Sequence, residues 1–177
     1  MKFAALVALL LAAMMPAAEQ PTAKVPRTSL APLESAFDAR MTRPGQDDPF
    51  DLLGNTRGVY LPGYGVVLTA EVNLVTTPPI TPFRPAVIKE DAANLRRRKL
   101  AKLEVLKKAM RELMASTASS LGSLPPGEQV AVAVTLFYYS WEQRAGLPSQ
   151  ILMQAPRAAL LGGAGPSLDA ALRIEEF

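Results

Sequence analysis

The most regular pattern of apolar positions lies between Lys89 and Leu121. Mostly apolar side chains recur there at intervals of three or four residues, while nine arginine and lysine residues lie among the other positions. That spacing places the apolar side chains on one face of an α-helix, so the segment is predicted to form one long amphipathic helix. At 1.5 Å per residue it would be roughly 50 Å long. The positions that define the apolar face are Leu95, Leu100, Leu103, Leu106, Met110, Leu113, Thr117 and Leu121.

An alternation with a period of two marks the predicted strands. Gly58–Leu61 and Val66–Leu74 are rich in β-branched and aromatic residues, and Pro62–Gly65 joins them, a combination typical of a β-hairpin. Gln129–Tyr139 is apolar on both faces, which predicts a central strand covered on both sides. Ser149–Ala155 is the fourth predicted strand. In the second strand, alternation predicts a buried face formed by Val66, Leu68, Ala70, Val72 and Leu74.

Two shorter helices complete the predicted fold, one over Leu30–Met41 and one over Leu168–Ile174. The order is then helix, two strands, long helix, two strands and helix. It predicts an α+β fold in which a small antiparallel sheet of about four strands packs against the long helix in two layers. Residues 1–18 are interpreted as a signal peptide, 19–29 as a flexible tether and 30–177 as a single domain.

The first residues have the composition of a secretory leader. Lys2 precedes an apolar run from Phe3 to Met15, and Pro16–Ala18 supplies the small residues of a cleavage site. The uncharged stretch is shorter than the roughly 20 residues that a membrane-spanning helix needs. Cleavage after Ala18 is expected and would leave 159 residues (177 − 18) in a secreted or periplasmic protein. A retained leader that anchors the protein is the alternative.

The composition excludes several kinds of chemistry. The 177 residues include no cysteine and no histidine. Disulfides, thiolate nucleophiles, Ser-His-Asp triads and the usual zinc sites are therefore ruled out. Asp47, Asp48 and Asp51 lie close together but lack the spacing of a calcium-binding loop. No catalytic residue, metal site or cofactor is predicted, and a non-enzymatic protein is the expectation.

The long helix carries the clearest charge asymmetry. Between Lys89 and Glu112, nine basic and four acidic side chains give a net charge of +5. Such a surface attracts an acidic protein face or an anionic envelope component, and a membrane surface is a further candidate partner. Nucleic acid is not expected, because the protein is exported and no aromatic residue interrupts the basic run. The candidate binding residues are Arg96, Arg97, Arg98, Lys99, Lys102, Lys107, Lys108 and Arg111.

A second candidate surface lies in the loop after the predicted central strand, where Tyr139, Trp141 and Arg144 combine aromatic area with a charge. The sequence thus predicts an exported interaction protein, and exposed sheet edges make a homo-oligomer a further candidate assembly. The alternative is a carboxylate-dependent enzyme or a small-ligand-binding protein. Glu71, on the polar face of its predicted strand, or Glu142, in the loop, would then lie in its site.

Overall fold

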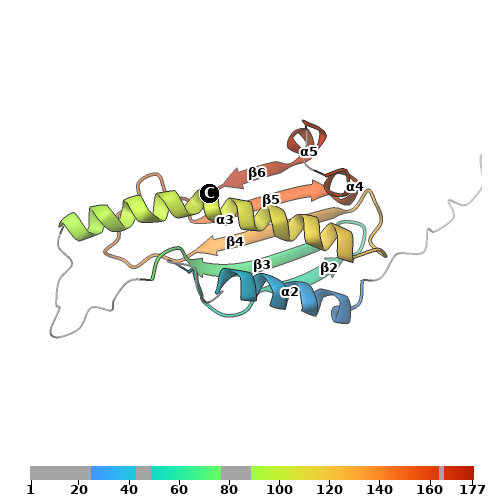
Figure 1. The fold of residues 1–177 in the computed structure, drawn as a ribbon, viewed down its shortest axis with the longest axis horizontal. Coiled ribbons are helices and arrows are strands. Elements are labelled where there is room, and N and C mark those ends of the chain that lie inside the picture. The colour runs from blue at the N-terminus through green and yellow to red at the C-terminus, as the bar shows by residue number, and fades with distance from the viewer. Residues whose placement is uncertain (1–24, 43–48, 77–88, 164–165) are drawn as a thin grey trace, which may run out of the picture.

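A mixed sheet of six strands forms one layer of the protein. The computed structural model describes residues 25–42, 49–76, 89–163 and 166–177. The sheet has the order β1-β3-β4-β5-β6, and β2 pairs with β3 on the same side as β1 (Figure 1). The strands are β1 (Asp51–Leu52), β2 (Arg57–Leu61), β3 (Gly65–Asn73), β4 (Gln129–Leu136), β5 (Gln150–Pro156) and β6 (Arg173–Glu176).

One pair of neighbouring strands, β3 and β4, runs parallel, and the other pairs run antiparallel. The connection between β3 and β4 contains α3 (Lys89–Ser120), a helix of 32 residues. A helix of this length returns the chain to the end of the sheet where β3 began, so the next strand must run in the same direction as β3. The predicted long helix is confirmed almost to the residue.

The second layer consists of α3 and α2 (Arg27–Met41), which lie on the same face of the sheet (Figure 1). Their apolar side chains pack on alternate residues of β3, β4 and β5. Two short helices, α4 (Arg157–Leu161) and α5 (Pro166–Ala171), lie between β5 and β6 in the chain. The core includes Leu33, Phe37, Leu106, Met110, Val66, Leu68, Val130, Val132, Ile151 and Met153.

Helix α2 holds β2 through two carboxylates one helical turn apart. A carboxylate oxygen of Glu34 accepts a hydrogen bond from the backbone N–H of Gly58 at 2.5 Å, and Asp38 accepts one from Thr56 at 3.0 Å. Thr56 precedes β2, and the Gly58 N–H bonds to α2 rather than to β3, so these backbone donors are satisfied where an unpaired strand edge would otherwise invite a partner. Glu34 is also paired with Arg27, which helps to keep this buried carboxylate charged.

Neither α2 nor α3 covers the opposite face of the sheet. We call this the open face. Register places one row of residues across it, running from β2 to β6: Val59, Val67, Ala131, Gln154 and Arg173. Val59 is half exposed, and the neighbouring Leu61 is exposed as well. Along this row the open face is therefore apolar from β2 to β4 and polar at β5 and β6.

The α+β class, the two layers, the hairpin and the buried face of β3 agree with the sequence prediction. The prediction of four antiparallel strands was wrong, because the sheet has six strands and includes one parallel pair. The expectation that β4 is covered on both faces holds at Ala131, which is buried on the open face, but not along the rest of the strand. Ala133 on the open face is partly exposed, Thr135 is exposed, and the two main helices lie on the other face.

Two boundaries also differ from the prediction. Helix α2 begins at Arg27, within the predicted tether. Pro26 is its N-cap residue, and the Ser29 N–H bonds to the Pro26 carbonyl in the first turn. The predicted terminal helix over Leu168–Ile174 ends at Ala171, and Arg173–Glu176 pairs with β5 as strand β6. The predicted signal peptide lies outside the described residues.

Candidate functional site

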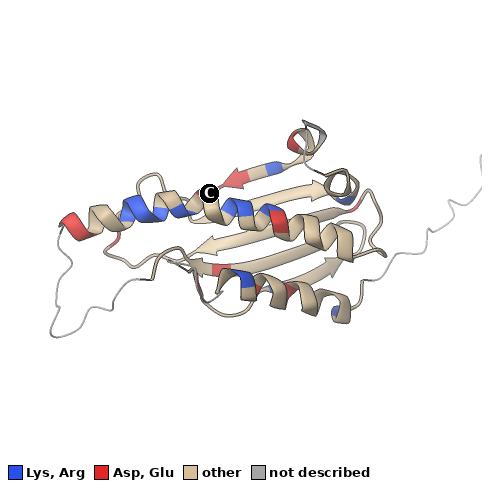
Figure 2. Cartoon of the chain, viewed as in Figure 1, with Lys and Arg blue, Asp and Glu red and all other residues tan. Residues whose placement is uncertain are grey.

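The basic residues of α3 divide into exposed and buried groups. Four of them point away from the sheet and form what we call the basic ridge: Arg97, Arg98, Lys108 and Arg111. Figure 2 shows cationic residues gathered along this helix. Two acidic residues close to the ridge, Glu104 and Glu112, each pair with a cation outside it, Lys107 and Arg40 respectively. The ridge thus presents four exposed cationic side chains, and the two neighbouring acidic residues are paired with cations outside it.

Lys99 does not belong to an exposed surface, and its assignment to one was wrong. Its side chain is fully buried and pairs with the equally buried Glu142 at 2.6 Å. The reason is its helical position, because Lys99 lies four residues after Leu95 and four before Leu103 on the buried face. Burial lowers the pKa of Lys99 from its ordinary value, and the hydrogen bond and charge of Glu142 oppose that shift.

Three further predicted binding residues hold parts of the fold together. Lys107 bridges Glu104 on its own helix and Glu176 on β6, at 3.0 and 2.6 Å. The ammonium of Lys102 lies over the ring of Phe50 at 4.5 Å from its centroid. Arg96 donates a hydrogen bond from Nε to the carbonyl of Ala145 at 2.7 Å. Their contacts are intramolecular.

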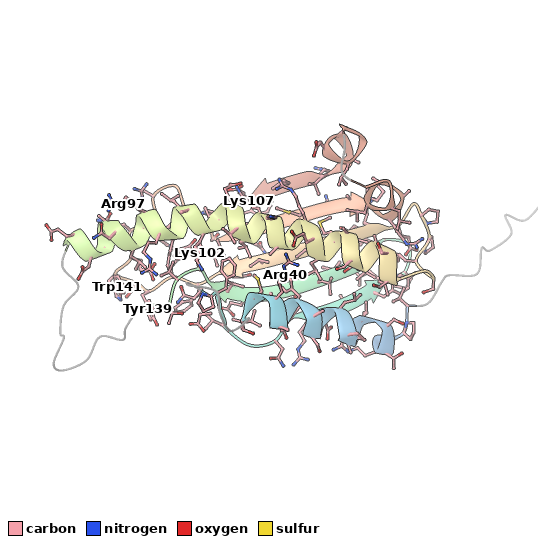
Figure 3. All side chains as sticks on the ribbon, in the orientation of Figure 1. Arg40, Arg97, Lys102, Lys107, Tyr139 and Trp141 are labelled. Carbon is pink, nitrogen blue, oxygen red and sulfur yellow. The ribbon has the colours of Figure 1, made fainter. Side chains whose placement is uncertain are left out.

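The loop between β4 and β5 packs beneath the end of α3 that extends past the strands (Figures 1 and 3). Tyr139 and Trp141 stack with their ring centroids 5.7 Å apart, and Trp141 packs against the core. Tyr139 remains exposed, and the Arg144 guanidinium lies 5.8 Å from the ring of Tyr138. Burial raises the pKa of Tyr138 to about 12. The loop is thus fixed by packing and by the Lys99–Glu142 pair.

The two carboxylates of the enzymatic alternative lie in different settings. Glu142 uses one oxygen for Lys99 and the other to accept the backbone N–H of Tyr139 at 3.1 Å. Glu71 is exposed on the open face of β3, opposite Thr135. Neither residue lines the pocket described next.

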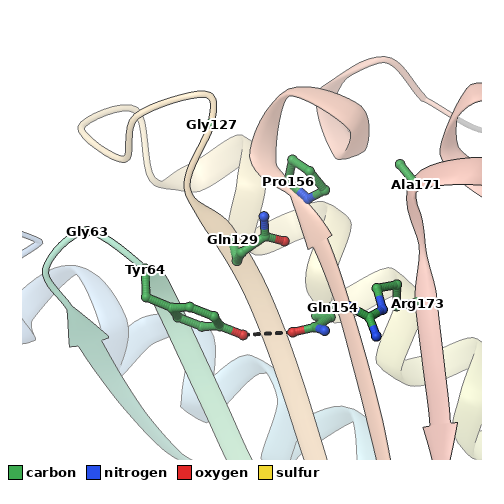
Figure 4. Close-up of a pocket in the computed structure, with 8 residues that line it drawn as sticks. All are labelled: Gly63, Tyr64, Gly127, Gln129, Gln154, Pro156, Ala171 and Arg173. Carbon is green, nitrogen blue, oxygen red and sulfur yellow. Dashed lines mark hydrogen bonds between the residues drawn. The ribbon is translucent and has the colours of Figure 1, made fainter.

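A pocket of about 500 Å³ lies at one end of the open face (Figure 4). Its polar groups come from the β2–β3 turn and from three strands: the phenol of Tyr64, the amides of Gln129 and Gln154, and the guanidinium of Arg173. Tyr64 reaches across β4, and its hydroxyl donates a hydrogen bond to Gln154 Oε1 at 2.8 Å. Gly63, Gly127, Pro156 and Ala171 complete the lining.

No pattern in the sequence predicts this pocket. Tyr64 lies in the predicted hairpin turn Pro62–Gly65, and no motif marks Gln129, Gln154 or Arg173. The convergence depends on register, since Gln154 pairs with both Ala131 and Arg173 across neighbouring strands. The one sequence feature that points to the pocket is Gln154, a polar side chain within the predicted strand Ser149–Ala155.

Among the described residues, no cluster of three or more acidic side chains could hold a metal ion, and no helix is long and apolar enough to span a membrane. Asp47 and Asp48 lie outside the described residues. The fold and its surfaces define an α+β protein with two separate candidate sites, the basic ridge and the pocket. No protein-family model, curated protein or solved structure matches this chain.

Proposed function

We propose that the protein is an exported, non-enzymatic interaction protein that binds an acidic face of a partner protein through the basic ridge of α3. The observation that carries this proposal is the division of α3 into a buried apolar face and an exposed cationic one. Lys108 and Arg111 are exposed on the same side of the helix as Arg97. Acidic groups on a partner would be complementary to this cationic face. Such complementarity speeds association and fixes the orientation of the partner more than it adds affinity.

A protein partner is favoured over a lipid surface because the apolar face of α3 is already occupied. Helices that lie in a membrane interface bury their apolar face among the acyl chains. In α3, Leu106, Met110 and Met114 are fully buried against the rest of the fold. Contact with lipid would depend on charge alone, at about 1 kcal/mol for each cation near the surface.

The ridge also has the mixed character of a protein interface. Val105 is half exposed between Arg98 and Lys108, and the acidic Glu104 and Glu112 lie beside it. An apolar residue surrounded by polar and charged groups is typical of the centre and rim of a protein contact. No aromatic residue is among the ridge residues, so base stacking has no support there.

The test compares the wild-type protein with the variant Lys108→Glu/Arg111→Glu. The probes are a poly-glutamate peptide, vesicles containing anionic phosphatidylglycerol, and single-stranded DNA. We expect salt-sensitive binding of the peptide by the wild-type protein and at least about a tenfold loss in the variant, because two attractive charges become repulsive. Arg57→Glu on the open face is the control, since it makes the same kind of charge change away from α3.

Each outcome of this test bears on the proposal. Binding of vesicles without binding of the peptide would replace the protein partner with a membrane surface. Binding of DNA at equal strength would show a nonspecific cationic surface, and absence of all binding at low salt would overturn the proposal. Light scattering on the same samples measures whether the protein associates with a second copy of itself.

The carboxylate-dependent alternative has less support. Glu142 is occupied by Lys99 and by a backbone N–H, and Glu71 lies on an exposed strand face. General acid–base catalysis requires a positioned carboxylate within reach of a bound substrate. The pocket on the open face offers a place for a ligand, but amides, a phenol and a guanidinium line it rather than a carboxylate.

A further inference from the structure

The pocket on the open face is built from segments far apart in the chain. Tyr64 comes from the β2–β3 turn, Gln129 from the start of β4, Gln154 from β5 and Arg173 from β6. Its volume of about 500 Å³ lies within the range of pockets that bind small molecules. It lies on the face of the sheet opposite α3, and so it is separate from the basic ridge.

Two of the polar side chains, those of Tyr64 and Gln154, are held in place before any ligand arrives. The Tyr64 hydroxyl donates to Gln154 Oε1, which orients that amide and leaves its NH₂ group to act as a donor. The backbone carbonyl of Tyr64 accepts the N–H of Gln129 at 2.7 Å, which fixes the turn against β4. Preorganised groups of this kind lower the entropic cost of binding.

Hydrogen-bond donors predominate in the pocket. Arg173 contributes a guanidinium that forms an ion pair with Glu175 at 3.3 Å, and its side chain remains 71% exposed, so a ligand can still reach it. The Gln154 NH₂ group is a second donor, and the amide of Gln129 can donate and accept. No aspartate or glutamate lines the pocket. This set of groups complements a ligand with a carboxylate and neighbouring hydrogen-bonding groups.

The remaining lining limits the size and shape of that ligand. Pro156 and Ala171 provide a small apolar surface, and Gly63 and Gly127 have no side chain to occupy the space. We propose that this pocket binds a small ligand in which a carboxylate stands beside an amide or a hydroxyl group. The carboxy-terminal end of a short peptide and an acidic sugar both have this chemistry.

The experiment titrates the full chain with four probes and follows the side-chain signals of Gln129, Gln154 and Arg173 by ¹⁵N NMR. The probes are N-acetyl-alanyl-alanine, its carboxy-terminal amide, glucuronic acid and glucose. We expect one or both of the carboxylate compounds to shift these signals, with their uncharged counterparts at least about tenfold weaker, because hydrogen bonds to a charged group are the stronger ones. Comparison of N-acetyl-alanyl-alanine with glucuronic acid identifies whether a peptide or a sugar carboxylate binds in the pocket.

Three variants test the assignment of residues. Arg173→Gln removes the charge at an exposed position and should weaken binding at least about tenfold, while Tyr64→Phe frees the Gln154 amide and should weaken it about threefold. Arg57→Gln, on the same open face but outside the pocket, should leave binding unchanged. The proposal would be overturned if the wild-type protein bound the acid and its amide equally well, or if Arg173→Gln bound the carboxylate probes as well as the wild-type protein does. It would also be overturned if no probe shifted the signals. None of these results depends on the basic ridge, which is tested by different residues.

Discussion

The Lys99–Glu142 pair joins α3 to the loop between β4 and β5, and both side chains are almost completely buried. Removing two charges from water is costly, and their attraction offsets that cost only while both partners are present. Lys99 has two further contacts, with the Phe137 carbonyl at 3.4 Å and over the ring of Tyr138 at 4.8 Å. The pair therefore fixes the position of this loop more than it adds net stability.

Glu142→Gln should destabilise the protein by about 3–5 kcal/mol at neutral pH, because it leaves a buried ammonium without its counter-charge. Glutamine can still accept the Tyr139 N–H, so the change isolates the charge. Burial lowers the pKa of Lys99 in the folded protein, and loss of Glu142 removes the interaction that opposes this shift. Urea unfolding followed by circular dichroism measures the loss.

The pH dependence has a definite sign. A lysine with a lowered folded pKa destabilises the fold fully below that pKa, and the penalty disappears above the unfolded pKa of about 10.4. The loss in Glu142→Gln should therefore shrink as the pH rises toward about 10. The control Glu104→Gln changes an exposed partner of Lys107 and should cost about 0.5 kcal/mol or less. A loss as small as the control's would contradict burial of the pair.

The apolar spacing around Lys99 was sufficient to place it on the buried face of the helix, but lysine is almost never fully buried without a partner. The partner, Glu142, lies in a loop whose path the sequence does not define. The same limit applies to Gln129, Gln154 and Arg173. Each occupies an ordinary position on its own strand, and only the register of three strands brings them to one pocket.

At the level of elements, α2 is attached to β2 by side-chain carboxylates rather than by apolar packing alone. Hydrogen bonding to Arg27 is the largest cause that lowers the pKa of Glu34, and burial opposes it. A carboxylate with a lowered folded pKa stabilises the fold above its unfolded pKa of about 4.3, and that stability is lost as the pH falls through the folded value.

Glu34→Gln should reduce stability at neutral pH by about 1–3 kcal/mol, because the buried hydrogen bonds lose their charge. It should also flatten the fall in stability below about pH 4.3, since the titrating group is gone. Hydrogen exchange provides a local measurement, with faster exchange expected at the Gly58 N–H than in the wild-type protein. Asp38→Asn is the matched comparison and should act mainly at Thr56. Unchanged exchange at Gly58 would contradict the contact.

The parallel pairing of β3 with β4 begins at Gly65, which pairs with Gln129. Gly65 has a φ of +137°, and a Cβ atom there would overlap the backbone of Gln129. Gly65→Ala should therefore destabilise the protein by about 2–4 kcal/mol, through backbone strain and steric overlap. Gly122→Ala is the control, because nothing lies within 4 Å of its added Cβ. Equal melting temperatures for the two variants would show that β3 and β4 do not approach as described.

The hairpin, the long helix and the buried face of β3 could be predicted because each follows from a local pattern. The parallel β3–β4 pair could not, since it depends on where α3 returns the chain. Strand β6 was not predicted, and the predicted helix Leu168–Ile174 included its first two residues, because Arg173–Glu176 has little β-propensity of its own. Pairing with β5 outweighs that preference. Elements with weak local signals are the ones that tertiary contacts determine.

On the scale of the whole molecule, the sequence predicts export, and both proposed sites would then act outside the cytoplasm. The absence of cysteine means that no disulfide contributes to stability in either compartment. The described fold instead relies on one apolar core between the two helices and the sheet, with ion pairs that connect α3 to a loop and to β6.

Export is tested by expressing the full chain in a Gram-negative host and measuring the intact mass in each cell fraction. The wild-type protein should be recovered from the periplasm without residues 1–18, as 159 residues (177 − 18). Leu9→Arg places a charge in the apolar run, at a cost of about 3 kcal/mol for membrane insertion, and should leave the chain uncleaved in the cytoplasm. Leu9→Ile is the control and should be processed normally. A full-length wild-type chain in the membrane fraction would indicate a retained anchor. Full-length protein in the cytoplasm would refute export, and nucleic acid would then become a candidate partner of the basic ridge.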